Sequence, residues 1–170
     1  MRFFILLLIT LIFSGCTATY KQNILSESNR KLNTKTPIII STPDNALYDG
    51  KTYFSSGKTV ALSIRSSIAR YADNITISTK CSLLYCLQKQ PTTESSYYII
   101  PLILHWEDRA TEWSGIPDKL EIKISIYNSQ NHNKLSSVVL SGKSKWATFG
   151  GDHPQDLLPD LLDKYIKSLY

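Results

Sequence analysis

Strong charge of one sign is missing from this sequence of 170 residues. Nineteen lysines and arginines stand against 14 aspartates and glutamates, and no long block of like charges occurs. Because such blocks are typical of chains that bind nucleic acid, we expect no nucleic-acid partner. The small basic excess is compatible only with an unspecific attraction to anionic lipid or glycan. The length fits one folded domain.

Long hydrophobic runs are also missing, apart from one at the start. Arg2 precedes an apolar run over residues 3–13 that only Thr10 interrupts. The run is too short for a membrane-spanning helix, which needs about 20 residues, so an uncleaved transmembrane helix is the less favoured interpretation. The small residues Ser14 and Gly15 follow. This charged, hydrophobic and small-residue order is that of a secretory signal peptide.

The next residue, Cys16, gives this signal a more specific form. The pattern resembles the signal of bacterial lipoproteins, in which the cysteine becomes the lipidated first residue of the mature protein. The resemblance implies removal of residues 1–15 and a lasting anchor, because each buried acyl methylene contributes about 0.8 kcal/mol. Thr17 stands where an aspartate would retain a Gram-negative lipoprotein in the inner membrane. The implied location is the outer membrane with the domain facing the periplasm, and a surface-exposed location stays open.

Residues 16–36 lack both helical and alternating periodicity. They are rich in Ser, Thr, Asn, Lys and Gln with scattered apolar residues. Such a composition is typical of a flexible segment. We therefore predict a lipidated tether over residues 16–36 and one periplasmic α/β domain over residues 37–170.

Apolar periodicity predicts a two-layer α/β (α+β) domain. A strand, a helix and a strand come first and favour a right-handed parallel crossover. A short helical turn, a three-stranded antiparallel meander and a C-terminal helix follow, with Pro101 implying an edge or a bulge and Pro159 a kink or a delayed start. We expect a mixed five-stranded sheet with helices on one face. The expected elements lie at 38–40, 57–73, 75–78, 81–90, 97–106, 120–127, 135–146 and 154–169.

Cysteine is scarce, and only Cys81 and Cys86 remain once Cys16 is assigned to lipid. In an oxidising periplasm we favour a disulfide between them, which would stabilise the fold by roughly 2 kcal/mol. On a continuous helix their α-carbons would lie about 7.5 Å apart, beyond disulfide reach. The disulfide therefore excludes an unbroken helix over residues 81–86. A redox pair is disfavoured because the spacing is not Cys-x-x-Cys.

Motifs of catalysis and nucleotide binding are absent. Gly57-Lys58-Thr59 resembles part of a phosphate loop, but the glycine required five positions earlier is replaced by Thr52. No Gly-x-Ser-x-Gly pattern marks a nucleophile. The carboxylates of Glu107, Asp108, Glu112 and Asp118 have no defined separation that would indicate a glycosidase. We therefore predict no enzyme activity, no nucleotide and no cofactor.

One segment, residues 105–115, is dense in functional side chains. On a strand His105 and Glu107 would share one face, and with Asp152 and His153 they could form a metal site. Nothing in the spacing requires a metal, and we favour an ion pair of Arg109 with Glu107, Glu112 or Asp108 that holds the loop. Large aromatics could stack on sugars, although they more often fill the space between sheet and helices.

Two blocks, residues 103–115 and 141–158, resemble an uncharacterised family of Gram-negative lipoproteins, domain of unknown function 4823. The likeness begins at about residue 37 and covers most of the mature chain. It implies a small periplasmic domain behind a lipoprotein signal and carries over no ligand or catalytic residue. More loosely, the order of elements is similar to accessory periplasmic domains of envelope assembly and secretion lipoproteins, which is an analogy of fold alone.

Both blocks lie where strands end, so they could meet in one polar, aromatic-floored patch. Our leading hypothesis is a non-enzymatic outer-membrane lipoprotein whose domain contacts another envelope component, protein or glycan. The alternatives are a small-ligand or glycan-binding module, or a hydrolase, at the same patch, and structural locking of two loops is an equal alternative to binding. The candidate binding patch consists of His105, Trp106, Glu107, Asp108, Arg109, Trp113, Trp146, Asp152 and His153.

Overall fold

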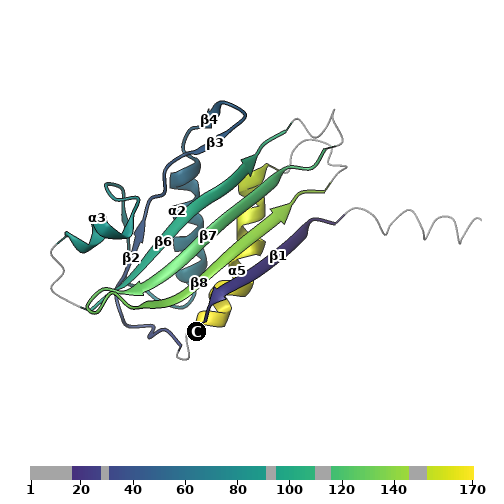
Figure 1. Ribbon diagram of the computed structural model, residues 1–170. Helices are drawn as coiled ribbons and strands as arrows, with labels where there is room; N and C mark the ends of the chain where they lie inside the picture. Colours follow the sequence, from purple (N-terminus) through teal and green to yellow (C-terminus); the bar gives the residue numbers. More distant parts are fainter. Residues whose placement is uncertain (1–16, 28–30, 91–94, 110–115, 146–152) are drawn as a thin grey trace, which may run out of the picture.

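A mixed six-stranded sheet forms the centre of the protein (Figure 1). The computed structural model describes residues 17–27, 31–90, 95–109, 116–145 and 153–170. The strands lie in the order β1-β8-β7-β6-β2-β5. They are β1 (Thr19–Ser26), β2 (Ile38–Ser41), β5 (Ile75–Ser78), β6 (Tyr97–Glu107), β7 (Lys119–Asn128) and β8 (Lys134–Lys143).

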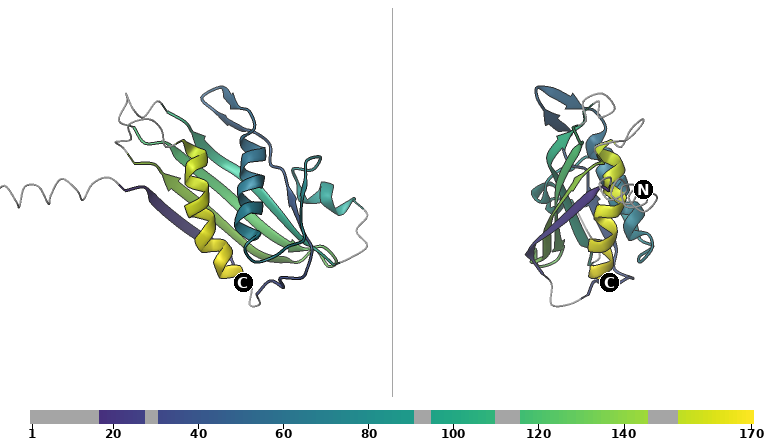
Figure 2. Two further views of the ribbon diagram at one scale, coloured as in Figure 1. Left: turned by 180° about the vertical axis from the view of Figure 1, so that it is seen from behind. Right: turned by 90° about the vertical axis from the view of Figure 1, so that its right-hand side faces the viewer.

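Two helices, α2 (Ser56–Ile68) and α5 (Leu158–Leu169), lie side by side on one face of this sheet (Figure 2). Alternation along β7 explains the two layers. Leu120, Ile122, Ile124 and Ile126 are buried in the main core cluster with the apolar faces of both helices. The residues between them point to the opposite face, as successive side chains of a strand must. The predicted α+β class, with a mixed sheet and a C-terminal helix, is confirmed.

The parallel crossover is also confirmed, because β2 pairs in parallel with β5 and the two strands flank α2 along the chain.

The packing at the start of α2 explains why the Gly57-Lys58-Thr59 motif begins with a glycine. A Cβ atom at position 57 would collide with the backbone carbonyl oxygen of Pro43. The glycine is thus required for close backbone packing.

The C-terminal helix begins late, as Pro159 predicts. A short 3-10 helix, η1 (Pro154–Leu157), precedes α5. Pro159 then lies in the first turn of α5, where its missing N–H leaves no hydrogen bond broken.

Pro101 lies in β6 beyond the last residue that pairs with β2, and a bulge follows between Ile103 and His105. Both features agree with the expectation from Pro101.

The predicted tether is wrong over residues 19–26, because these residues form β1 and pair antiparallel with β8. The sheet therefore has six strands where five were expected. Most β1 side chains are exposed, so the strand shows no apolar alternation and is held by its backbone ladder. A cross-layer contact adds to this, since the Tyr20 hydroxyl lies 2.8 Å from an Asp160 carboxylate oxygen on α5.

The short helix α3 (Leu84–Gln88) corrects the expectation that all helices share one face. Leu87 and Cys81 pack against Tyr98 in a second, smaller cluster, on the face of the sheet opposite α2 and α5. Cys81 and Cys86 form a disulfide with their α-carbons 5.4 Å apart. The helix begins only at Leu84. The disulfide and the broken helix therefore occur together, as the geometry predicts.

A small hairpin that the sequence analysis missed projects from one end of the sheet (Figure 1). It consists of β3 (Ala46–Tyr48) and β4 (Lys51–Tyr53). Asp49 and Gly50 have positive φ angles of 50° and 72°, the values that a tight primed turn requires. Across the described ranges, no helix combines the length and apolar character needed to cross a bilayer.

Candidate functional site

The candidate patch is built around one buried carboxylate, Glu107, at the end of β6. The residue is only 1% exposed. Its carboxylate lies 2.9 Å from the His105 imidazole Nε2 and 2.9 Å from the Lys119 Nζ. The Arg109 guanidinium donates to its other oxygen. Three basic side chains, two of them from one strand end, thus surround a single acid.

This arrangement fixes the ionisation state of Glu107. Burial alone opposes ionisation, but hydrogen bonds from His105, Lys119 and Arg109 outweigh it and lower the pKa of Glu107 to about 2. A general acid requires the opposite shift, toward a raised pKa. The carboxylate is therefore a permanent anion that holds its neighbours.

Further contacts join the ends of three strands and the hairpin. The Arg109 guanidinium donates to the Tyr48 hydroxyl of β3 at 3.2 Å. The Arg109 backbone N–H donates to the Asp118 carboxylate at 2.5 Å. Asp118 in turn exchanges hydrogen bonds of 2.9 and 3.0 Å with Ser144, just after β8. The expected ion pair of Arg109 with Glu107 is present, and it holds the ends of these strands together.

A second, more exposed pair connects this end of the sheet to the C-terminal segment. The His153 Nδ1 lies 3.1 Å from an Asp108 carboxylate oxygen. That hydrogen bond is the main cause of a raised pKa of His153. The His153 backbone N–H also donates to Asp156 at 2.9 Å, which caps η1. The two sequence blocks therefore meet in space through Asp108 and His153.

Trp106 takes the core position that is usual for large aromatics and does not form the floor of the candidate patch. It lies between His105 and Glu107 on β6, so its side chain points to the opposite face of the sheet. It is 3% exposed and belongs to the main core, where its ring centroid lies 6.5 Å from that of Tyr53. Its indole N–H has no hydrogen-bond partner among the described residues. Trp106 is thus a core residue and not a stacking surface.

Three of the expected patch residues, Trp113, Trp146 and Asp152, lie outside the described residues, as does Cys16. Apart from Trp106, the structure brings the remaining members together in two groups, one around Glu107 and one at Asp108 and His153. Within the part of the chain that the structure describes, no group of three His, Cys, Asp or Glu residues could hold a metal ion.

A pocket beside this patch was missed by the sequence analysis. It lies on the face of the sheet opposite α2 and α5, is lined by Lys21, Lys119 and Lys143 together with His105, and has a volume of about 170 Å³. Its residues come from four strands, so only cross-strand register brings them together. The sole available signal was alternation along β7, which places Lys119 on the same face as Glu121.

Comparison with known families identifies the domain. A model described as "Domain of unknown function (DUF4823)" matches residues 30–169. The chain belongs to this family. No curated protein is similar enough in sequence to match it.

Solved structures share the fold of this DUF4823 domain. The subunit of the PelC dodecamer from Paraburkholderia phytofirmans has a TM-score of 0.64 at 11% identity, over 90% of this chain and 97% of that one. A single-substitution variant of that PelC dodecamer gives 0.62 at 11% identity, over the same 90% and 97%. A DUF330 protein from Xanthomonas campestris gives 0.48 at 9% identity, over 92% of this chain and 91% of that one. At such identities the likeness to PelC concerns the fold alone.

Proposed function

We propose that this protein is a lipid-anchored, non-enzymatic component of the outer membrane whose periplasmic domain contacts another envelope component, protein or glycan. The observation that carries the proposal is the pairing inside the candidate site. Glu107 is surrounded by three basic side chains and its pKa lies at about 2, so its charge is used to lock strand ends. Since this carboxylate serves the fold and not catalysis, we infer that the domain acts by binding a partner through its surface.

Two further features support the envelope location. The first is the signal pattern that ends at Cys16. The second is the disulfide between Cys81 and Cys86, because structural disulfides persist in oxidising compartments such as the periplasm. The position of Thr17 after the cysteine favours the outer membrane.

Lipidation at Cys16 is tested by growing cells with radiolabelled palmitate and measuring the intact mass of the mature protein. We expect incorporation of label and a mass that begins at a modified Cys16. The Cys16→Ala variant should lose both. An unmodified thiol in the natural chain would overturn the placement and every envelope partner with it.

The contact itself is tested by crosslinking in intact cells, with the Cys16→Ala variant as control. A specific partner should be captured by the anchored chain and lost when the anchor is removed. Adding sugars or peptidoglycan fragments while tryptophan fluorescence is recorded separates a glycan from a protein partner. A flat titration together with no anchor-dependent crosslink would contradict the proposal.

A second candidate is self-assembly, because the PelC subunit, whose fold is similar over 97% of its length, is described as part of a dodecamer. Both outermost strands of the sheet, β1 and β5, pair on one side only within the described ranges. Unpaired strand edges are ready sites for pairing with another chain. Native mass spectrometry of the detergent-solubilised protein tests this, and a monomer at all concentrations would exclude it.

A further inference from the structure

The face of the sheet opposite α2 and α5 carries basic side chains that form no ion pair with a described residue. Lys21 on β1 and Lys143 on β8 are exposed, and neither forms an ion pair with a described residue. Both line the pocket of about 170 Å³, together with Lys119 and the single acid Glu121. The pocket lining therefore holds three lysines against one carboxylate.

Strand register makes this arrangement unfavourable for the isolated fold. Lys143 lies directly opposite Lys119 in the β7–β8 ladder, and like charges at directly opposed positions destabilise a sheet. The Lys119 ammonium is partly compensated by Glu107, 2.9 Å away. Lys143 has no such compensation within the described ranges. A bound anion would relieve this repulsion.

The pocket lies close to the proposed lipid anchor, so the nearest anions would be those of the membrane surface. Thr19, the first residue of β1, lines the pocket. Only Thr17 and Ala18 separate it from Cys16, and three residue steps span at most about 11 Å. A lipid on Cys16 would therefore hold this end of the sheet at the membrane surface. The long tether expected from the sequence would not have done so.

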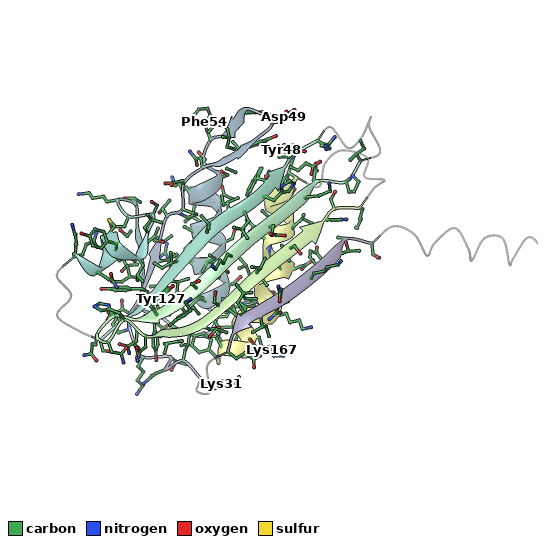
Figure 3. All side chains as sticks on the ribbon, in the orientation of Figure 1. Lys31, Tyr48, Asp49, Phe54, Tyr127 and Lys167 are labelled. Atoms are coloured by element: carbon green, nitrogen blue, oxygen red, sulfur yellow. A yellow bond between two sulfur atoms is a disulfide. The ribbon has the colours of Figure 1, made fainter. Side chains whose placement is uncertain are left out.

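The same end of the molecule presents apolar side chains to solvent. Leu47 on β3 is 69% exposed and Phe54, just after β4, is 83% exposed. Their hairpin is tied to the patch by Tyr48, whose ring lies 5.1 Å from that of His105. Figure 3 shows Phe54 and Tyr48 at one end of the domain and Lys167 near the opposite end. Basic and apolar groups side by side are what a membrane interface binds.

We propose that this end of the domain rests on an anionic leaflet, with the phosphate of a lipid headgroup in the pocket formed by Lys21, Lys119 and Lys143. The inference rests on the proposed anchor at Cys16. Each lysine that reaches an anionic surface contributes about fivefold in affinity. The contact orients the domain on the membrane, and it makes the hairpin with Phe54 a second point of attachment.

The test compares lysine acetylation, read by mass spectrometry, in the mature lipidated protein reconstituted into zwitterionic or into phosphatidylglycerol-containing vesicles. We expect the three pocket lysines to be acetylated about fivefold more slowly on the anionic vesicles. Lys167, near the far end of α5, should react equally on both. High salt should remove the protection, because exposed charges are screened.

Matched variants sharpen the result. The double variant Lys21→Gln with Lys143→Gln should lose the protection of Lys119 on anionic vesicles. The control, Lys164→Gln with Lys167→Gln, removes the same charge from the exposed side of α5 and should keep it. Equal acetylation of the pocket lysines on both kinds of vesicle would overturn the proposal.

Two further measurements separate this inference from the proposed anchor. Flotation with both kinds of vesicle reports the anchor alone, so flotation without lysine protection refutes only the headgroup contact. Loss of flotation refutes the anchor and the contact together. Inorganic phosphate is added to the detergent-solubilised protein as a third arm. Equal protection by free phosphate would identify a soluble-anion site and would also overturn the membrane assignment.

Discussion

Two neighbouring groups of basic side chains at one end of the sheet differ in what compensates their charge. His105, Arg109 and Lys119 share the buried carboxylate of Glu107. Lys143 lies directly opposite Lys119, and Lys21 lies in the cross-strand row that also holds Glu121 and His105. Neither Lys21 nor Lys143 has an ion-pair partner among the described residues. The first group therefore stabilises the fold, whereas the second adds repulsion to it. Residues of the same chemistry thus serve structure or contact according to whether an acid is buried beside them.

The largest effect should come from removing the shared acid. Glu107→Gln should lower the free energy of unfolding by about 3 kcal/mol, since it removes the buried anion that pairs with the Arg109 and Lys119 cations. Urea unfolding of the mature protein measures this. The control is Glu121→Gln on β7, which lies on the same face of the sheet as Glu107. For this variant we expect a change within about 0.5 kcal/mol. Equal effects of the two substitutions would show that Glu107 has no special structural role.

Acid should weaken the same group in the natural protein. The folded pKa of Glu107, about 2, lies below the ordinary value of 4.5. Ionisation therefore contributes stability that is present above pH 4.5 and is lost as the pH falls toward 2. Urea midpoints measured between these pH values should fall less steeply for Glu107→Gln than for the natural chain. Parallel curves would contradict the assignment.

The Asp108–His153 pair should behave in the opposite sense and more weakly. Its hydrogen bond raises the pKa of His153, so the pair contributes stability below the ordinary histidine pKa of 6.5, and this stability is lost as the pH rises through the folded pKa. The His153 side chain is 52% exposed, and solvent limits such pairs to about 0.5 kcal/mol. His153→Gln should cost this much at pH 5.5 and nothing at pH 8.5. A pH-independent cost would indicate packing alone.

The sequence predicted those features that depend on local periodicity. The α+β class, the crossover around α2 and the delayed start of α5 all follow from apolar spacing and proline positions. The shared face of His105 and Glu107 follows from the two-residue period of a strand. The disulfide followed from the compartment and the cysteine spacing.

What the sequence could not show depends on neighbours that are distant along the chain. β1 is an edge strand with mostly exposed side chains, so it resembles a linker in composition. Lys119 meets Glu107 only through the β6–β7 register. The pocket needs β1, which was expected to be a tether. Because residues 19–26 were predicted to be a tether, nothing in the sequence indicated the basic surface to which β1 contributes.

The smallest expected effect is a gain in stability, whereas disrupting the ion pairs around Glu107 should only lower stability. Lys143→Gln should raise the free energy of unfolding by about 0.3 kcal/mol, because it removes a like charge directly opposite Lys119. Urea unfolding in low salt should show the gain, and high salt should abolish it by screening. Lys167→Gln on α5 is the matched control and should show no gain. If Lys143→Gln destabilised the protein in low salt, an internal anion would have to compensate Lys143, and the lysine would belong with the group around Glu107.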